Sequence, residues 1–169
     1  MTSREQASFL ATWSTEAQKT LAVLRALPAE QYDFRPDPQG RSIGELGWHL
    51  AEVEALTVNA VVNGKMDFAA KIPGLERPRT VAELASGYER VQAMLAEQVR
   101  ALGPVELERK LASPLGGDVS VSEVLWGWML HHAIHHRGQL TLMCRLAGGT
   151  PPGVYGPTRE EMAAMRARA

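Results

Sequence analysis

Residues 80–102 read TVAELASGYERVQAMLAEQVRAL and carry the clearest structural pattern in the chain. Apolar side chains recur every three or four residues along this stretch, at Val81, Leu84, Tyr88, Val91, Leu95, Val99 and Leu102. Because an α-helix turns once in about 3.6 residues, this spacing places an apolar stripe on one helical face. Gly103 and Pro104 follow directly and end the pattern. The stretch therefore predicts an amphipathic helix over residues 81–102.

The same helix-start signal precedes this stretch and four others. It is a Ser or Thr followed three residues later by Glu, as in Thr2/Glu5, Ser42/Glu45, Thr80/Glu83, Ser120/Glu123 and Thr158/Glu161. Such a pair can form a capping box, in which the hydroxyl accepts from a backbone N–H of the first turn and the Glu accepts from the N–H of the capping residue. Each pair opens a periodic apolar stretch, so we expect five helix starts.

The pattern predicts four long helices, over residues 3–27, 43–62, 81–102 and 121–147, and a short amphipathic helix after Thr158. No segment shows a convincing period-two alternation of the kind that marks a strand. Four amphipathic helices bury their apolar stripes economically in a four-helix bundle. We therefore predict an all-α fold, a four-helix bundle with a short C-terminal fifth helix, as a single domain over residues 1–169.

The connection over residues 64–79 is longer than two antiparallel neighbours need. Sixteen extended residues span about 50 Å, enough to run the length of a bundle and join two parallel helices. This favours an up-down-down-up topology.

Composition narrows the class of protein. The formal net charge is −1, without the basic excess that phosphate neutralisation requires, so we expect no nucleic-acid partner. No apolar run reaches 18 residues and the first residues do not resemble a signal peptide, so we expect no membrane span and a cytoplasmic location. The single cysteine, Cys144, lies in an apolar helical pattern, where we interpret it as a packed thiol and not a nucleophile.

Four of the five histidines lie within residues 131–136, and the fifth is His49. The four make two pairs with i, i+4 spacing, and either pair could chelate one ion because residues four apart share a helical face. Counting from Val121 at helical spacing places His132 and His136 inward, and His131 and His135 toward the flank. Part of the pattern supports the other face, so the pair His131/His135 stays open as an alternative.

His49 lies at the edge of the apolar stripe of residues 43–62. One imidazole from this helix and two from residues 121–147 would hold a divalent metal and leave coordination positions for substrate or water. The alternative is that the histidines only satisfy hydrogen bonds in the core. Ferritin-like di-iron chemistry and the zincin signature are disfavoured, since their Glu-x-x-His and His-Glu-x-x-His motifs are absent.

Two segments, SIGELGWHL at 42–50 and HAIHHRGQL at 132–140, resemble the DinB-like superfamily of YfiT-type, damage-inducible bundle proteins. Residues 34–36 (FRP) and the region of Pro151, Pro152 and residues 155–157 also fit. The resemblance covers nearly the whole chain. It implies an up-down-down-up bundle, often dimeric, with a divalent metal held by three histidines that map to His49, His132 and His136. Zinc or nickel is the metal that it implies, and iron or manganese also suits three imidazoles.

Characterised members of this family include metal-dependent thiol S-transferases and a mycothiol-dependent isomerase. The resemblance therefore implies a metal-dependent transferase that activates a low-molecular-weight thiol for attack on a small electrophile, acting as a homodimer. Two alternatives are a non-catalytic metal- or small-molecule-binding protein of a stress response, and a bundle without a metal whose main surface activity is dimerisation.

Several neighbouring residues have both a site interpretation and a structural one. Arg137 and Gln139 would orient substrate or make inter-helix contacts, and Glu45 would support His49 or serve only in its capping box. Packing is the simpler role for Tyr155, and core or interface positions are the simpler role for Trp48, Trp126 and Trp128.

Overall fold

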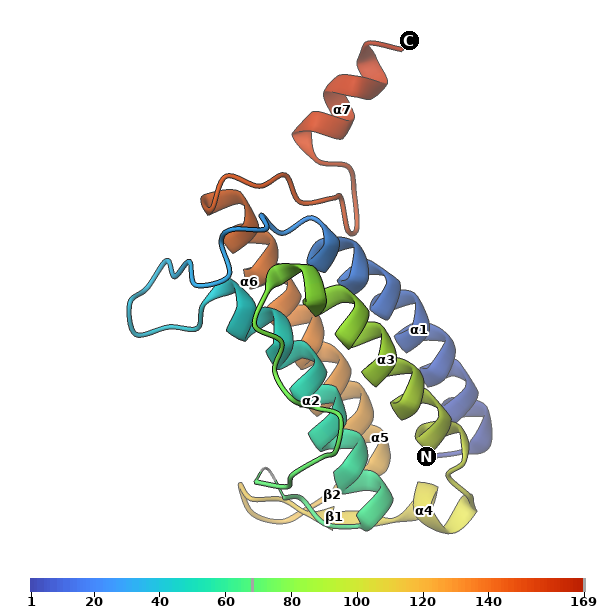
Figure 1. The fold of residues 1–169 in the computed structure, drawn as a ribbon. Helices are drawn as coiled ribbons and strands as arrows, with labels where there is room; N and C mark the ends of the chain where they lie inside the picture. Colours follow the sequence, from blue (N-terminus) through green and yellow to red (C-terminus); the bar gives the residue numbers. More distant parts are fainter. Residues whose placement is uncertain (68, 169) are drawn as a thin grey trace.

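The computed structural model describes residues 1–67 and 69–168 and arranges four long helical segments side by side (Figure 1). They are α1 (Ser3–Arg25), α2 (Ile43–Asn63), α3 (Val81–Arg100), and a continuous fourth segment made of α5 (Val121–Glu123), the π-helix η1 (Val124–His131) and α6 (His132–Leu146). The first and fourth segments run one way and α2 and α3 the other (Figure 1). The predicted up-down-down-up four-helix bundle is confirmed.

Two positions lie outside the described residues. Phe68 belongs to the predicted 64–79 connection, and Ala169 is the last residue of the predicted domain.

The capping residues explain where most helices begin. Ser42, Ser120 and Thr158 form complete capping boxes with the Glu three residues later. The Thr2 hydroxyl accepts from the Glu5 backbone N–H at 3.1 Å. Thr80 differs from the prediction, because its hydroxyl donates to the Glu83 carboxylate at 2.7 Å and makes no cap bond to the backbone.

A short region at one end of the bundle departs from the sequence prediction. It holds α4 (Pro104–Glu108) and an antiparallel hairpin of β1 (Lys110–Ala112) and β2 (Asp118–Ser120), with Leu111 opposite Val119. The sequence did not predict this hairpin. Three-residue strands are too short to show an alternating pattern, and the hairpin relies on Gly116 and Gly117, whose φ angles of 97° and 73° favour glycine.

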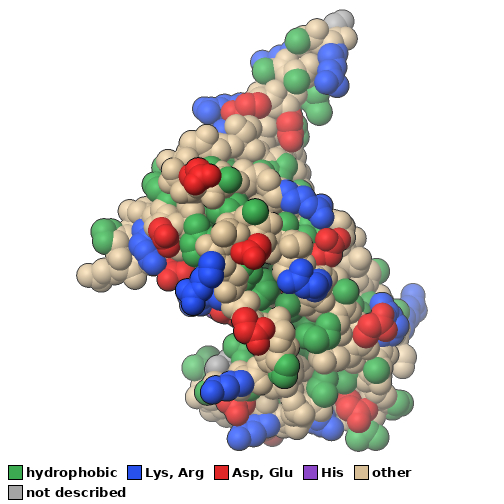
Figure 2. All heavy atoms as spheres, viewed as in Figure 1, with side chains coloured by type: hydrophobic (Ala, Val, Ile, Leu, Met, Phe, Trp, Pro, Cys, Tyr) green, Lys and Arg blue, Asp and Glu red, His purple; other side chains and the backbone are tan. Residues whose placement is uncertain are grey.

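The last helix, α7 (Arg159–Arg166), confirms the predicted short C-terminal helix and projects away from the bundle (Figure 1). Its side chains include no buried residue. Over the face of the bundle seen in Figure 2, Lys and Arg side chains are interspersed with Asp and Glu. Within residues 1–67 and 69–168, no helix has both the length and the apolar character needed to cross a bilayer.

The apolar stripe of residues 81–102 is buried throughout, as predicted, and α3 packs mainly against α1 and α2. Trp48 is 2 % exposed, and its indole N–H donates to the Leu75 carbonyl at 3.1 Å, which attaches the long connection to α2. Trp126 and Trp128 are half-buried. Cys144 is buried, and burial raises the pKa of its thiol, as suits a packed side chain and not a nucleophile.

A carboxyl group lies within this apolar core. Glu54 of α2 is 2 % exposed, and its Oε1 accepts from the Tyr88 hydroxyl at 2.7 Å. Its Oε2 has no hydrogen-bond partner among the described residues. Burial raises the pKa of Glu54 from 4.5 to about 7, against the opposing effect of the Tyr88 hydrogen bond.

This raised pKa predicts a pH-dependent stability. Between pH 4.5 and 7 the folded state keeps a proton that the unfolded state has released, so the contribution of Glu54 to the free energy of unfolding falls as pH rises through this window. Glu54→Gln has no proton to lose. We therefore expect the free energy of unfolding of Glu54→Gln, relative to that of wild type, to increase by at least about 1 kcal/mol between pH 4 and pH 8.

Urea denaturation at pH 4, 6 and 8 would measure this difference. Glu97→Gln, an exposed position on α3, is the control and should show no such trend. A wild-type to Glu54→Gln difference that stays constant with pH would contradict the prediction.

Candidate metal centre

Three histidines meet between α2 and α6. The ring centroids of His132 and His136 are 4.5 Å apart, and that of His49 lies 4.9 Å from His136 and 5.7 Å from His132. Each ring offers one nitrogen, and these atoms all lie within 4.8 Å of one another. Nitrogens that bind one ion at about 2.0–2.1 Å lie within about 4.2 Å of each other, so small side-chain rotations are enough to fit a divalent metal. The structure therefore brings together the three residues that the sequence singled out.

The helical geometry before His132 corrects one part of the prediction. His132 is exposed and His136 half-buried, and the buried stripe of α6 instead runs through Ala133, Arg137, Leu140, Met143 and Cys144. The i→i+5 bonding of η1 uses more residues per turn than an α-helix, so a stripe counted at α-helical spacing from Val121 loses its phase. The histidine pair flanks the core beside α2 and does not point into the core.

The alternative pair lies outside this group. His131 and His135 are exposed. His135 lies next to the centre, with its ring centroid 5.2 Å from that of His136. Its Nε2 is 3.1 Å from Nε2 of Gln139.

Gln139 has the site contact that the sequence allowed for it. Its Oε1 lies 2.6 Å from Nδ1 of His136. An amide oxygen only accepts, so Nδ1 carries the proton and Nε2 keeps its lone pair for a ligand. Burial lowers the pKa of His136 to about 4, which keeps its ring neutral at pH 7. Partial desolvation and the nearby His49, His135 and Arg41 lower the pKa of His132.

Glu52 supports His49 and was missed by the sequence reasoning. Its Oε2 lies 3.5 Å from Nδ1 of His49, and its Oε1 accepts from Arg77 at 3.1 Å. His49 and Arg77 lower the pKa of Glu52 against the effect of burial. Metal-bound imidazoles are usually oriented by a carboxylate in this way. The i, i+3 spacing of His49 and Glu52 was the available signal.

Glu45, the residue considered for that role, has other partners. It completes the capping box of Ser42 and accepts from Arg35 at 2.6 Å. Its capping interpretation is confirmed.

Arg137 faces the opposite side of α6 and makes the inter-helix contacts that were its alternative role. It is 2 % exposed, and its guanidinium donates to the Glu16 carboxylate and to the Tyr155 hydroxyl, each at 2.5 Å. Tyr155 thus packs on this network and not at the three histidines.

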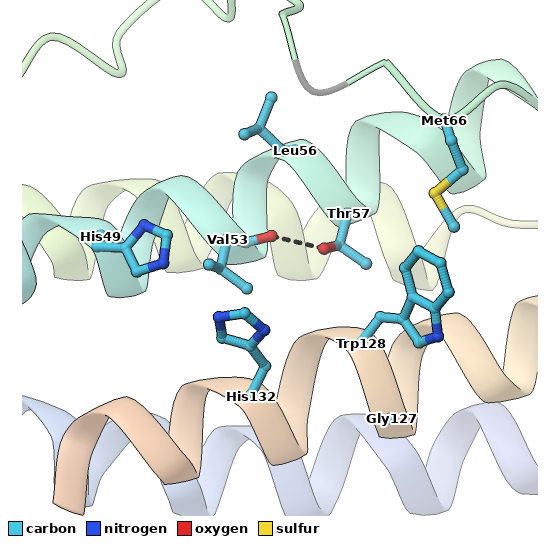
Figure 3. Close-up of a pocket in the computed structure, with 8 residues that line it drawn as sticks. All are labelled: His49, Val53, Leu56, Thr57, Met66, Gly127, Trp128 and His132. Carbon is cyan, nitrogen blue, oxygen red and sulfur yellow. Dashed lines mark hydrogen bonds between the residues drawn. The ribbon is translucent and has the colours of Figure 1, made fainter. Parts of the chain in front are cut away.

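Two cavities of different character border the histidines. The first, of about 500 Å³, is lined by His49, Val53, Leu56, Thr57, Met66, Gly127, Trp128 and His132 (Figure 3). The second, of about 290 Å³, is lined by Pro36, Asp37, Gly40, Arg41, Leu46, His136, Gln139 and Met143. The three-histidine cluster thus separates a mainly apolar cavity from one that also carries charged and amide side chains.

Comparison with known proteins agrees with this fold. The DinB family model matches residues 1–168. The chain is 27 % identical over 156 residues to the uncharacterized protein YrdA of Bacillus subtilis (strain 168), covering 92 % of this chain and 90 % of that protein.

Three solved structures are also similar. They are the DinB-like protein YjoA of Bacillus subtilis (TM-score 0.71, 20 % identity, 90 % of this chain and 99 % of that one), a DinB-like protein of Bacillus cereus ATCC 10987 (TM-score 0.69, 26 % identity, 87 % and 95 %), and YfiT of Bacillus subtilis (TM-score 0.65, 12 % identity, 89 % and 91 %). YfiT is described as a probable metal-dependent hydrolase with an unusual four-helix bundle topology. With the family model matching nearly every residue, the chain belongs to the DinB family.

Proposed function

We propose that the protein is a metal-dependent transferase that joins a low-molecular-weight thiol to a small electrophile. The observation that carries this proposal is the position of the three imidazoles at the boundary of two unlike cavities. His49 and His132 border the mainly apolar cavity, and His136 borders the one that also carries charged and amide side chains. Two cavities on either side of one centre suit a reaction between two different molecules, whereas a simple binding protein needs only one.

His49, His132 and His136 would hold the metal, which we propose to be zinc or nickel, with iron or manganese also compatible with three imidazoles. A divalent ion supplies Lewis acidity that lowers the pKa of a coordinated thiol from its usual value of about 8.5 toward neutrality. Glu52 and Gln139 orient two of the rings through their second nitrogens. The apolar side chains of Val53, Leu56 and Met66 line the cavity on the side of His49 and His132.

Hydrolysis is the second candidate, because YfiT is described as a probable metal-dependent hydrolase. A hydrolase usually places a general base beside the attacking water. Among the described residues that line the apolar cavity there is no carboxylate. On this side of the centre a thiol is favoured, since it needs no separate base once its pKa is lowered; the carboxylate of Asp37 lines the second cavity.

The proposal also covers the cellular location and the oligomeric state of the protein. Low-molecular-weight thiols stay reduced in the cytoplasm, which is the location that the proposed chemistry requires. We propose a homodimer without nucleic-acid or membrane partners. A non-catalytic metal- or small-molecule-binding role in a stress response is the alternative that the assay below separates.

The test combines metal analysis with a transfer assay. We expect protein purified without an affinity tag to hold about one divalent ion per chain and to conjugate a thiol to 1-chloro-2,4-dinitrobenzene. Bacillithiol, mycothiol, glutathione and cysteine are the thiols to compare. Activity should disappear after treatment with a chelator and return with zinc or nickel.

Three other results would count against this proposal. Turnover of p-nitrophenyl acetate without any thiol, at a rate above that of conjugation, would favour a hydrolase. Bound metal with no conjugation by any of the four thiols would favour a binding protein. Absence of metal, with a melting temperature unchanged by added zinc or nickel, would reject the centre itself.

A further inference from the structure

The cavity beside His49 and His132 has a composition that specifies its ligand. We propose that it binds the apolar body of an uncharged aryl or alkyl compound, with the polar or reacting end of that compound at the histidines. The inference rests on the proposed function for the chemistry at the histidine end. That the body of the ligand is apolar and uncharged is inferred from the size and the lining residues of the cavity.

The size of the cavity suits a small molecule. Its volume of about 500 Å³ lies within the range of about 300–1,000 Å³ that is usual for such sites. Val53 and Leu56 of α2 and Met66 line the cavity. Trp128 of η1 lies next to the Met66 side chain (Figure 3). An indole face and a flexible thioether can pack on either an aromatic ring or an alkyl chain.

The two imidazoles that line the cavity lie at one end of it. His49 and His132 lie together there, and Trp128 lies at the other end (Figure 3). The Thr57 hydroxyl donates to the Val53 carbonyl at 2.6 Å and therefore needs no partner from a ligand. No described lining residue is an Asp, Glu, Lys or Arg. A charged ligand body would lose its hydration here without compensation, whereas an apolar body would gain from burial.

Gly127 makes this cavity testable. It lines the cavity from η1, and a Cβ built on it meets no atom within 4 Å outside its own neighbourhood. A larger side chain at this position therefore has space, at a residue that itself lines the cavity. Gly138, on the same helical segment, also leaves space for a Cβ but does not line this cavity, so it provides a matched control.

The experiment compares wild type, Gly127→Leu and Gly138→Leu with indole as the probe. Indole has no strong metal-binding group, so its binding can be measured by NMR titration with and without chelator. We expect wild type and Gly138→Leu to bind it with a Kd below about 1 mM and Gly127→Leu to bind it at least about 10-fold more weakly. Metal content should be the same in all three, and both variants should fold, because leucine has a higher helix propensity than glycine.

The outcomes separate this inference from the proposed function. Equal indole binding by Gly127→Leu and wild type would overturn the inference, even with metal present in both. A second result would also overturn it. If wild type is a dimer that does not bind indole, and a Trp128 variant is a monomer, then a second copy of the chain covers the cavity. The protein could also be purified without metal and still bind indole, with binding lost in Gly127→Leu. That result would support the inference about the cavity and contradict the proposed function.

Discussion

Replacing His136 by alanine is expected to lower the metal affinity of the protein by roughly 100-fold or more, since it would remove one of the three proposed protein ligands. His132→Ala should have a similar effect. Both side chains come from one helix and approach His49 of α2, with ligand atoms within 4.8 Å. Losing either one leaves two imidazoles, which is too few to retain an ion against dialysis.

His131→Ala is the matched control. It changes the same residue type on the same helical segment, at an exposed position outside the three-residue cluster. We expect its metal content after dialysis to remain within about 3-fold of wild type, because no ligand is lost. Competition titrations with a chromophoric chelator would give the affinities. Equal metal retention by His131→Ala, His132→Ala and His136→Ala would overturn the ligand assignment, and loss in His135→Ala alone would favour the alternative pair.

Replacing Arg137 by alanine is expected to destabilise the protein by about 3 kcal/mol, at the lower end of the range for breaking a buried ion pair. Its guanidinium donates to the Glu16 carboxylate at 2.5 Å and to the Glu16 backbone carbonyl at 2.9 Å, which joins α6 to α1. Tyr155 donates to the same carboxylate and so attaches the loop before α7. Removing Arg137 leaves the mostly buried Glu16 carboxylate with one remaining cation, Lys19, whose Nζ lies 2.6 Å from Oε1 of Glu16.

The pH dependence of this effect follows from Glu16. Burial alone would raise the pKa of Glu16, but the hydrogen bonds from Lys19, Tyr155 and Arg137 lower it from 4.5 to about 2. A carboxyl group with a lowered pKa in the folded state contributes stability above pH 4.5 and loses that contribution as pH falls toward 2. The difference between wild type and Arg137→Ala should therefore shrink below pH 4.5.

Chemical denaturation of Arg137→Ala and Arg145→Ala at pH 7 and pH 3 would test this prediction. Arg145 lies on the same helix and pairs with Glu160 at 2.9 Å, but it is solvent-accessible, so its removal should change the unfolding midpoint much less. Equal effects of the two substitutions would contradict the role assigned to the buried network. Metal content should be retained in Arg137→Ala, since Arg137 faces away from the three histidines.

Much of the fold followed from local signals. Helix spacing and capping pairs predicted the four long segments, and the helix ends observed at residues 25, 63, 100 and 146 lie within two residues of those expected. These signals are local, because a helix is specified by side chains three or four residues apart. The hairpin at 110–120 escaped prediction because its strands are held by pairing across a turn and not by a long pattern.

Only part of the candidate site could be predicted from the sequence. Its residue types and the i, i+4 spacing of His132 and His136 stand in the sequence. His49, the one remaining histidine, was proposed as the third member from its place at the edge of an apolar stripe, and the family resemblance implied the same residue. Glu52 was available through its spacing but was passed over for Glu45. The wide turns of η1 could not be inferred from residue spacing, because they change the phase of the helix without changing the composition.

By itself, the sequence determined an all-α bundle and the five histidines from which a metal site could be built. Only the tertiary structure decided that His49 lies 4.9 Å from His136, that Arg137 is a buried contact to Glu16, and that Gly127 and Trp128 enclose an apolar cavity. The reason is physical. Helix periodicity is a property of neighbouring residues, whereas a ligand set and a cavity depend on how separate helices are rotated and offset when their stripes pack together.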